Sequence, residues 1–302
     1  MSLDFTGKVV IVTGAGGGLG RSHALDFARR GAKVVVNDLG GTLDGSGGSS
    51  EAAENVVAEI KSAGGEAIAN GSSVTDDAGV ANMIAQTMDA YGRIDALICN
   101  AGVLRDKSFS KMEIKDFEFV VDVHLMGTLK PIKAVWPIMK EQGYGRIVVT
   151  SSSSGLYGNF GQANYGAAKL GVVGLINTLK IEGQKDNIFA NALAPVAWTR
   201  MTENLMPPEA EQMLTPEVVT PAVVFMASEN APNGKIICAG AGSFASAIIL
   251  ETRGKYLGAN PTAEQVAENW EDISKLDDKA TIPFSGGEQT GHFFDLFKEA
   301  QG

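Results

Sequence analysis

The chain has 302 residues, of which 44% are hydrophobic and 20% are charged, and its formal net charge at pH 7 is −10. That length and composition fit one α/β domain with a substantial core, or two small globular domains. The negative charge, together with the lack of any run of basic residues, argues against nucleic acids and anionic membrane surfaces as partners.

Three sequence features concern the compartment. No apolar run approaches the roughly 18 residues of a membrane-spanning helix. The N-terminus, MSLDFTGK, has no signal-peptide pattern, and the C-terminus is not a peroxisomal address of the Ser-Lys-Leu kind. Cys99 and Cys238 lie in apolar, strand-like runs, which favours buried free thiols over a disulfide. These features predict a cytoplasmic protein.

Short β-branched runs alternate with stretches of helical periodicity along most of the chain. This pattern predicts an α/β fold with a doubly wound parallel sheet of seven strands, helices on both of its faces and a C-terminal helical extension. We expect one domain over residues 1–245, and an extension over 246–302 that packs on that domain or on a partner subunit. The expected strands are 8–13, 33–38, 66–70, 96–100, 145–151, 188–194 and 234–238, and the expected helices are 19–30, 51–63, 76–91, 114–142, 162–183 and 217–228.

A glycine-rich turn, TGAGGGLG, follows the first expected strand and opens a helix. Glycines let the backbone turn tightly and approach a pyrophosphate, while the amides of the helix N-terminus point at the phosphates. We therefore expect Gly14, Gly18, Leu19 and Gly20 to bind a dinucleotide, as in a Rossmann-type fold. Arg21 could contact phosphate or simply be solvated.

The second expected strand ends at Asp38. An acid at this point can accept hydrogen bonds from both ribose hydroxyls of NAD, and it would repel the 2′-phosphate of NADP. The glycine-rich turn has no basic residue to offset that repulsion, so NAD is the predicted cofactor. Residues 39–50, LGGTLDGSGGSS, are typical of an inserted flexible loop beside the adenosine end. The loop could fold over cofactor or substrate, or be inert.

Small residues follow the fourth expected strand. Asn100, Ala101 and Gly102 would lie at the carboxyl end of a parallel strand, where open α/β sheets bind ligands. Ser73 and Val74, which follow the third strand, are further expected cofactor residues. No metal site is expected.

Tyr165 and Lys169 are four residues apart, a spacing that puts both side chains on one face of a helix. A neighbouring ammonium favours the phenolate, which can remove a proton from an alcohol. Bringing the phenol pKa from about 10 to about 7 would need roughly 4 kcal/mol, which the lysine and a positively charged cofactor ring together could supply. Ser152, thirteen residues before Tyr165, could hydrogen-bond the same substrate oxygen. The alternative is a half-exposed tyrosine beside a solvated lysine.

The C-terminal third adds four features. Pro195 is followed by Thr199, which could hold a nicotinamide carboxamide, although a plain proline turn would look the same. Residues 200–216 lie where a mobile segment over the substrate usually lies. Thr262 resembles the start of a helix through Ile273. Pro283 and two glycines, Gly286–Gly287, should then break the chain before an aromatic terminal segment, 293–297.

TGAGGGLG, Asp38, CNAG, Ser152, YGAAK and the turn from Pro195 together resemble the short-chain dehydrogenase/reductase family over about residues 5–245. The resemblance implies NAD at the carboxyl edge of the sheet and hydride transfer between nicotinamide and an alcohol or carbonyl carbon. It also implies that Tyr165 is the acid/base, that Lys169 lowers its pKa and binds the ribose, and that Ser152 steadies the substrate oxygen.

Within that family, the segments VVNDLGG, NAGVLRDKSF, HLMG, SSGLYGNFGQANY and RMTENLMP resemble the (3R)-hydroxyacyl-CoA dehydrogenase unit of the peroxisomal multifunctional enzymes of type 2. This implies oxidation of a (3R)-3-hydroxyacyl-CoA thioester by a homodimer, or else a tetramer. The alternatives are a dehydrogenase of a hydroxysteroid or another secondary alcohol without CoA, and a non-catalytic NAD-binding protein.

The sequence departs from the wider family at two positions. His124 stands where most members have an asparagine that holds a water of the proton relay, so His124 either takes part in the relay or is a core histidine. Val196 follows Pro195 where glycine is usual. Arg105 and Lys107 could meet the phosphates of CoA or be solvated.

Overall fold

The computed structural model describes residues 3–42, 44–199, 201–202 and 208–301. The chain divides into two compact units, which are Met1–Ser246 (unit 1) and Ala247–Gly302 (unit 2). Among the described residues, no helix has both the length and the apolarity needed to cross a membrane.

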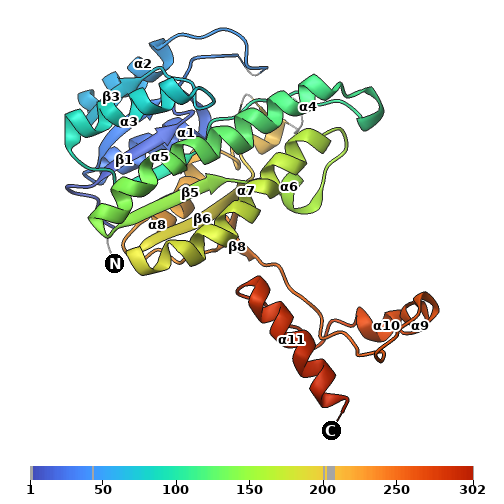
Figure 1. Ribbon diagram of the computed structural model, residues 1–302. Coiled ribbons are helices and arrows are strands. Elements are labelled where there is room, and N and C mark those ends of the chain that lie inside the picture. Colours follow the sequence, from blue (N-terminus) through green and yellow to red (C-terminus); the bar gives the residue numbers. More distant parts are fainter. Residues whose placement is uncertain (1–2, 43, 200, 203–207, 302) are drawn as a thin grey trace. The chain divides into compact units, whose positions relative to one another are not determined.

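Unit 1 is built around a sheet with the strand order β3-β2-β1-β4-β5-β6-β7-β8 (Figure 1). The pairs that link β3 through to β7 are all parallel, which confirms the doubly wound fold. The sheet has eight strands rather than the predicted seven. The extra strand, β8, consists mostly of small, exposed residues, so no apolar pattern marks it in the sequence. The strands are β1 Val9–Thr13, β2 Lys33–Asn37, β3 Glu66–Asn70, β4 Ala96–Cys99, β5 Gly145–Thr150, β6 Ile188–Pro195, β7 Ile236–Gly240 and β8 Ser243–Ala247.

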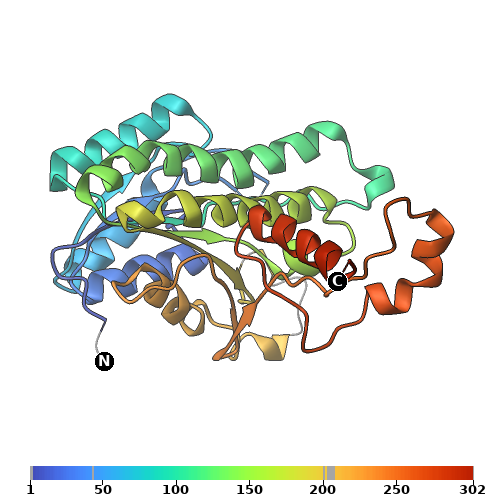
Figure 2. The same cartoon turned by 60° about the horizontal axis from the view of Figure 1, so that its bottom comes forward.

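Helices cover both faces of this sheet (Figure 2). α1 contacts α2 and α8 on one face, while α3 contacts α5 and α4 contacts α7 on the other. With helices on both sides, the central strands are buried on both faces, which explains their continuous β-branched runs. The helices of unit 1 are α1 Gly18–Arg29, α2 Glu51–Ser62, α3 Asp77–Tyr91, α4 Ile114–Val121, α5 Gly127–Gln142, α6 Ser153–Tyr157, α7 Ala163–Glu182 and α8 Thr220–Ala227.

The ends of α3 show how local sequence sets a helix. The Asp76 side chain accepts a hydrogen bond from the Gly79 amide at 2.8 Å, so one free amide of the first turn is capped. The helix ends at Gly92, whose φ of 70° is readily adopted only by glycine. These two signals confirm the predicted helix 76–91 to within one residue.

The helical stretch predicted over 114–142 is present, although it is not α-helical throughout. A π-helical turn, Asp122–Met126, separates α4 from α5. Such turns are rare and occur frequently at functional sites. This turn carries His124, and a Cβ on Gly102 would fall 2.4 Å from its Cε1 atom. His124 therefore packs directly against the backbone that follows β4.

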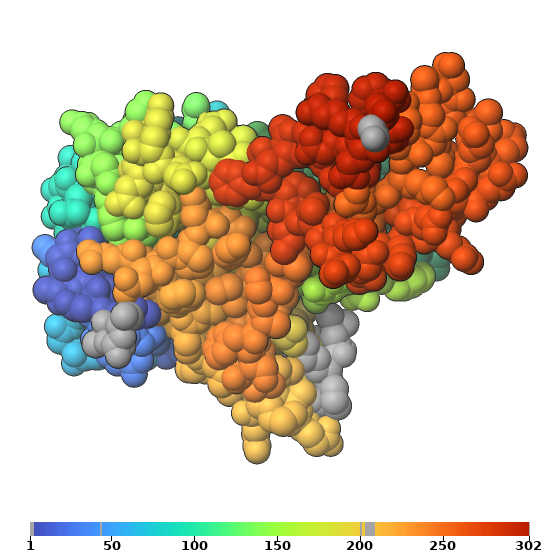
Figure 3. Space-filling view, turned by 90° about the horizontal axis from the view of Figure 1, so that it is seen from below, coloured from blue at the N-terminus to red at the C-terminus, as the bar shows by residue number. Residues whose placement is uncertain are grey.

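Unit 2 contains two short helices, α9 Ala263–Glu268 and α10 Trp270–Ile273, and a longer one, α11 Gly286–Glu299. The capping box of Thr262 with Gln265 is present, as the sequence predicted. Gly286 and Gly287 do not break the chain, because they form the first turn of α11. No described residue of unit 2 is fully buried. Large apolar side chains are exposed on this unit, which Figure 3 shows in orange and red; they include Trp270, Leu276, Ile282, Phe284, Phe293, Phe294 and Phe297.

Candidate active site

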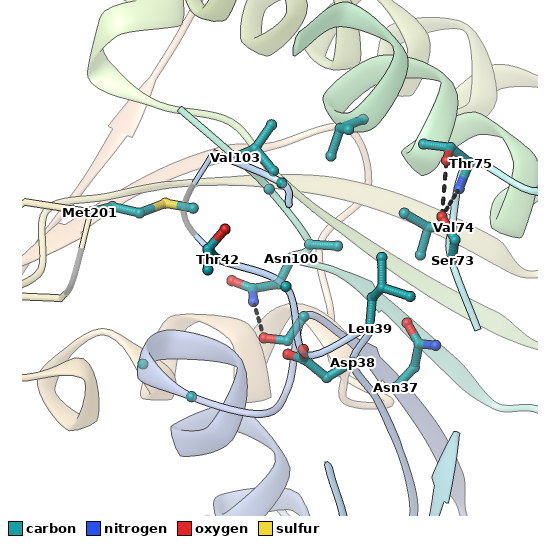
Figure 4. Close-up of a pocket in the computed structure, with 18 of the residues that line it drawn as sticks. Asn37, Asp38, Leu39, Thr42, Ser73, Val74, Thr75, Asn100, Val103 and Met201 are labelled. Carbon is teal, nitrogen blue, oxygen red and sulfur yellow. Dashed lines mark hydrogen bonds between the residues drawn. The ribbon is translucent and has the colours of Figure 1, made fainter. Parts of the chain in front are cut away.

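The chain order around the sheet reverses between β1 and β4. In an open α/β sheet, such a switch point leaves a crevice at the carboxyl ends of the two strands. A cavity of about 270 Å³ lies there (Figure 4). It is lined by Gly14, Gly17, Gly18, Leu19, Asn37, Asp38, Leu39, Gly41, Thr42, Gly45, Ser72, Ser73, Val74, Thr75, Asn100, Ala101, Gly102, Val103, Phe119, Val123, Thr199 and Met201.

Most of the predicted cofactor residues meet in this cavity. Those in its lining are Gly14, Gly18, Leu19, Asp38, Ser73, Val74, Asn100, Ala101, Gly102 and Thr199. Gly20, Pro195, Tyr165 and Lys169 do not line it. Pro195 is the last residue of β6, so it positions the turn that brings Thr199 to the cavity.

The glycine-rich turn is held against the residues after β4. The Asn100 side-chain amide donates to the carbonyls of Gly14 at 3.0 Å and of Thr13 at 3.2 Å. A Cβ on Gly14 would lie 2.6 Å from Ala101 Cα, and one on Gly20 would lie 2.2 Å from the Gly14 oxygen. Gly20 is therefore required for close packing of the turn, and its contact with the cofactor stays a prediction. The resulting cradle of bare backbone at the start of α1 fits a pyrophosphate.

Asp38 lines the cavity beside this turn. Its two carboxylate oxygens accept hydrogen bonds from the amides of Gly16 and Gly40, each at 2.7 Å. Both oxygens keep further acceptor capacity. Arg21 is not among the lining residues, because its guanidinium forms an ion pair with Glu59 at 2.6 Å. The phosphate contact considered for Arg21 stays a prediction.

The insertion over residues 39–50 folds back over the cavity. Leu39, Gly41, Thr42 and Gly45 all contribute to its lining. The structure thus favours the first of the two alternatives, in which the loop covers the ligand site.

Ser152, Tyr165 and Lys169 come together at the carboxyl end of β5. Ser152 caps α6, and its side chain is hydrogen-bonded to the Tyr165 phenol. Lys169, one turn after Tyr165 on α7, has its ammonium 5.5 Å from the phenol ring centroid. The predicted grouping of these side chains is therefore present, and their catalytic roles remain proposals.

The protein's own side chains do not lower the pKa of Tyr165. Burial raises the pKa of Tyr165 to about 12, and the hydrogen bond from Ser152 only partly opposes that rise. Lys169 is 4% exposed, and burial lowers its pKa to about 7. Its Nζ donates to the Thr150 carbonyl at 2.6 Å. With a pKa of about 7, Lys169 is only partly charged at neutral pH, so its ammonium alone does not offset the burial of the phenol, and a positively charged ligand would add to its effect.

His124 is packed against Tyr165. The two rings meet edge to face with centroids 5.0 Å apart, and His124 Nε2 lies 2.7 Å from the Val103 carbonyl oxygen. Burial, with Lys169 nearby, holds the pKa of His124 well below its ordinary value. Within the described part of the chain, its Nδ1 has no hydrogen-bond partner. His124 is thus a buried neutral ring beside the site, and a part in proton transfer stays a prediction.

Sequence reasoning missed one wall of the cavity. Phe119 and Val123 reach it from α4 and the π-helical turn, and only the apolar periodicity of that helix could have indicated them. Arg105 and Lys107 both pair with Asp116 at 3.1 Å, and both side chains remain partly exposed. The contact with CoA phosphates considered for them stays a prediction.

Two other expectations bear on the site. Arg200 and residues 203–207 of the segment expected over the substrate lie outside the described residues. The described residues hold no cluster of side chains suited to a metal ion.

Comparison with known proteins places the chain in one family. The short chain dehydrogenase family profile matches residues 8–210. A Mycobacterium tuberculosis protein whose name puts it among short-chain type dehydrogenase/reductases is 49% identical over 89% of this chain and 94% of its own length. The peroxisomal multifunctional enzyme type 2 of Mus musculus is 48% identical over 97% of this chain, which spans only 40% of that enzyme.

Similar solved structures support the same family. The full-length peroxisomal multifunctional enzyme type 2 of Drosophila melanogaster has a TM-score of 0.81 and 37% identity, over 98% of this chain and 50% of its own. A 7α-hydroxysteroid dehydrogenase complexed with NADH has a TM-score of 0.71 and 27% identity, over 79% of this chain and 95% of its own. The chain belongs to the short-chain dehydrogenase family, and it is an oxidoreductase that acts on a CH–OH group of a small molecule with a nicotinamide cofactor.

Proposed function

We propose that this protein oxidises a (3R)-3-hydroxyacyl-CoA to the 3-ketoacyl-CoA with NAD as hydride acceptor, as a homodimer. The observation that carries the chemistry is the cluster of Ser152, Tyr165 and Lys169 at the end of β5. The likeness to the multifunctional enzymes supports the substrate, because it extends over 98% of the chain, whereas the hydroxysteroid dehydrogenase matches 79%. The relatives' names include the word peroxisomal, and a cytoplasmic location for this chain stays a prediction.

In the proposed reaction, the substrate hydroxyl is held by Ser152 and the Tyr165 phenol, which are already hydrogen-bonded to each other. Tyr165 takes the hydroxyl proton, and Lys169 supports the developing phenolate. NAD, when bound, supplies the ring that accepts the hydride and a positive charge near the phenol. The glycine cradle and Asp38 would hold its pyrophosphate and adenosine ribose.

An assay of NADH absorbance tests the substrate. We expect turnover of a (3R)-3-hydroxyacyl-CoA with NAD, and little or none of its (3S) isomer or of a 17β-hydroxysteroid. Turnover of the steroid without the thioester would keep the hydride chemistry and reject the acyl-CoA assignment. No turnover of any alcohol, with NAD still bound, would favour a non-catalytic NAD-binding protein.

Exchange of Asp38 for asparagine should weaken the preference for NAD. The change removes the negative charge that repels a 2′-phosphate. One side-chain oxygen remains, which can still accept a hydrogen bond from the amide of Gly16 or Gly40. We expect the ratio of kcat/KM for NAD to that for NADP to fall by about tenfold or more, since charged hydrogen bonds contribute about 1.5–3 kcal/mol. Asp89→Asn, on the exposed surface of α3, is the matched control. An unchanged ratio would show that Asp38 does not select the cofactor.

A further inference from the structure

The insertion over residues 39–50 is internally organised. Main-chain hydrogen bonds join Ser49 to Leu39 and Thr42 to Ser46, each at 2.8 Å. The Asp44 carboxylate accepts from the Thr42 hydroxyl at 2.5 Å and from the Ser46 hydroxyl at 2.8 Å. The described part of the loop is therefore a closed turn with its own hydrogen bonds. Leu39, Gly41, Thr42 and Gly45 are the residues of the loop that line the cavity.

Residues distant in sequence hold the tip of this turn, Asp44 and Gly45, in place. The Arg105 guanidinium donates from Nε and Nη2 to the Asp44 carbonyl, at 3.3 and 3.2 Å. Gly45 lies so close to α4 that a Cβ there would fall 2.6 Å from the Phe119 ring. The tip thus contacts the Arg105 guanidinium and the Phe119 ring.

Arg105 is itself firmly anchored. Its guanidinium stacks 3.9 Å from the Phe119 ring centroid, and Nη1 pairs with Asp116 at 3.1 Å. Its main-chain carbonyl accepts from the Asn164 side chain at 3.1 Å, and Asn164 immediately precedes Tyr165. A planar fork with five donors can make these contacts together, which a lysine ammonium cannot. Arg105 therefore links the insertion to α4 and to the start of the catalytic helix.

We propose that Arg105 is a positioning residue for the cofactor, which holds the tip of the insertion over the dinucleotide cavity and so slows cofactor release. The identity of the ligand rests on the proposed function. The link between Arg105 and the insertion rests on the contacts alone. Because the contact between Arg105 and the insertion would cover a bound cofactor, its loss should change the rate of cofactor dissociation more than the rate of association.

Stopped-flow measurement of NADH binding tests this role of Arg105. Arg105→Met keeps an apolar side chain against Phe119 and removes the two guanidinium donors to the Asp44 carbonyl. We expect NADH to dissociate about tenfold faster from this variant, with an association rate close to wild type, given the usual size of hydrogen bonds from charged groups. KM for NAD should rise without a matching fall in kcat. Lys107→Met is the matched control, because Lys107 pairs with the same Asp116 and has no hydrogen bond to the described residues of the insertion.

A second variant and a ligand-free readout complete the test. Gly45→Ala pushes the tip off Phe119 and leaves Arg105 intact, so it should also speed NADH release. Without ligand, the amides of Gly45 and Ser46 should exchange with solvent faster in Arg105→Met than in wild type. The proposal is overturned if Arg105→Met leaves NADH dissociation and amide exchange unchanged, or if Lys107→Met speeds release equally. Failure of the wild type to bind NADH would instead reject the proposed function, and amide exchange would still decide the link to the insertion.

Discussion

Replacing Tyr165 with phenylalanine is expected to lower kcat by about a thousandfold, within the usual range for loss of a general acid or base. The phenol oxygen is the only atom removed, and its structural partner is the Ser152 hydroxyl. The edge-to-face contact with the His124 ring, at 5.0 Å between centroids, does not need that oxygen. NADH binding and the melting temperature should therefore stay close to wild type.

Steady-state turnover with the best alcohol of the substrate panel measures this effect, and fluorescence titration measures NADH binding. Tyr157→Phe makes the same chemical change at a side chain that is 74% exposed at the end of α6, and should have no effect. The role assigned to Tyr165 is wrong if its phenylalanine variant keeps more than about a tenth of wild-type kcat, because acid/base groups contribute at least about a hundredfold.

The sheet and the dinucleotide cradle could be predicted because their signals are local. β-branched runs such as Val9–Thr13 mark strands that are buried on both faces. Gly14 and Asp38 follow the ends of such strands, and parallel strands bring their carboxyl ends to one edge of the sheet. The spacing of Tyr165 and Lys169 on one helix is also a local property.

The rest depends on contacts between distant residues. The insertion is ordered by Arg105, 61 positions after Asp44, and composition alone left its fold open. The π-helical turn at His124 fits the close approach of the Gly102 backbone, which helical periodicity cannot reveal. Burial, which the spacing of Tyr165 and Lys169 does not reveal, raises the pKa of Tyr165 and lowers that of Lys169 in the protein alone.

Replacing Lys169 with methionine is expected to stabilise the ligand-free protein and to disable catalysis. Burial lowers the pKa of Lys169 from 10.5 to about 7. The unfolded chain therefore holds more protons than the native protein between about pH 7 and 10.5, and the stability of the wild type rises with pH across that window. The charge penalty in the native state is on the order of 5 kcal/mol near pH 6 and about 2 kcal/mol near pH 9.

Methionine keeps the length of the stem but loses the hydrogen bond to the Thr150 carbonyl, a contribution of about 1.5–3 kcal/mol. The difference leaves a net stabilisation of about 2–3 kcal/mol near pH 6 and almost none near pH 9. Chemical denaturation of the ligand-free protein at both pH values measures it. A variant that is less stable than wild type near pH 6 would show that the bond to Thr150 outweighs the buried charge.

Turnover should change in the opposite direction. Without the ammonium, only the positive charge that NAD supplies would remain to favour the Tyr165 phenolate, so kcat should fall by about a hundredfold or more. A gain in stability joined to a loss of activity is the pattern of a buried charge retained for function. If the methionine variant were both more stable and fully active, Lys169 would have no part in the proton transfer. Tyr165 would then depend on the bound cofactor alone for the positive charge that opposes its burial.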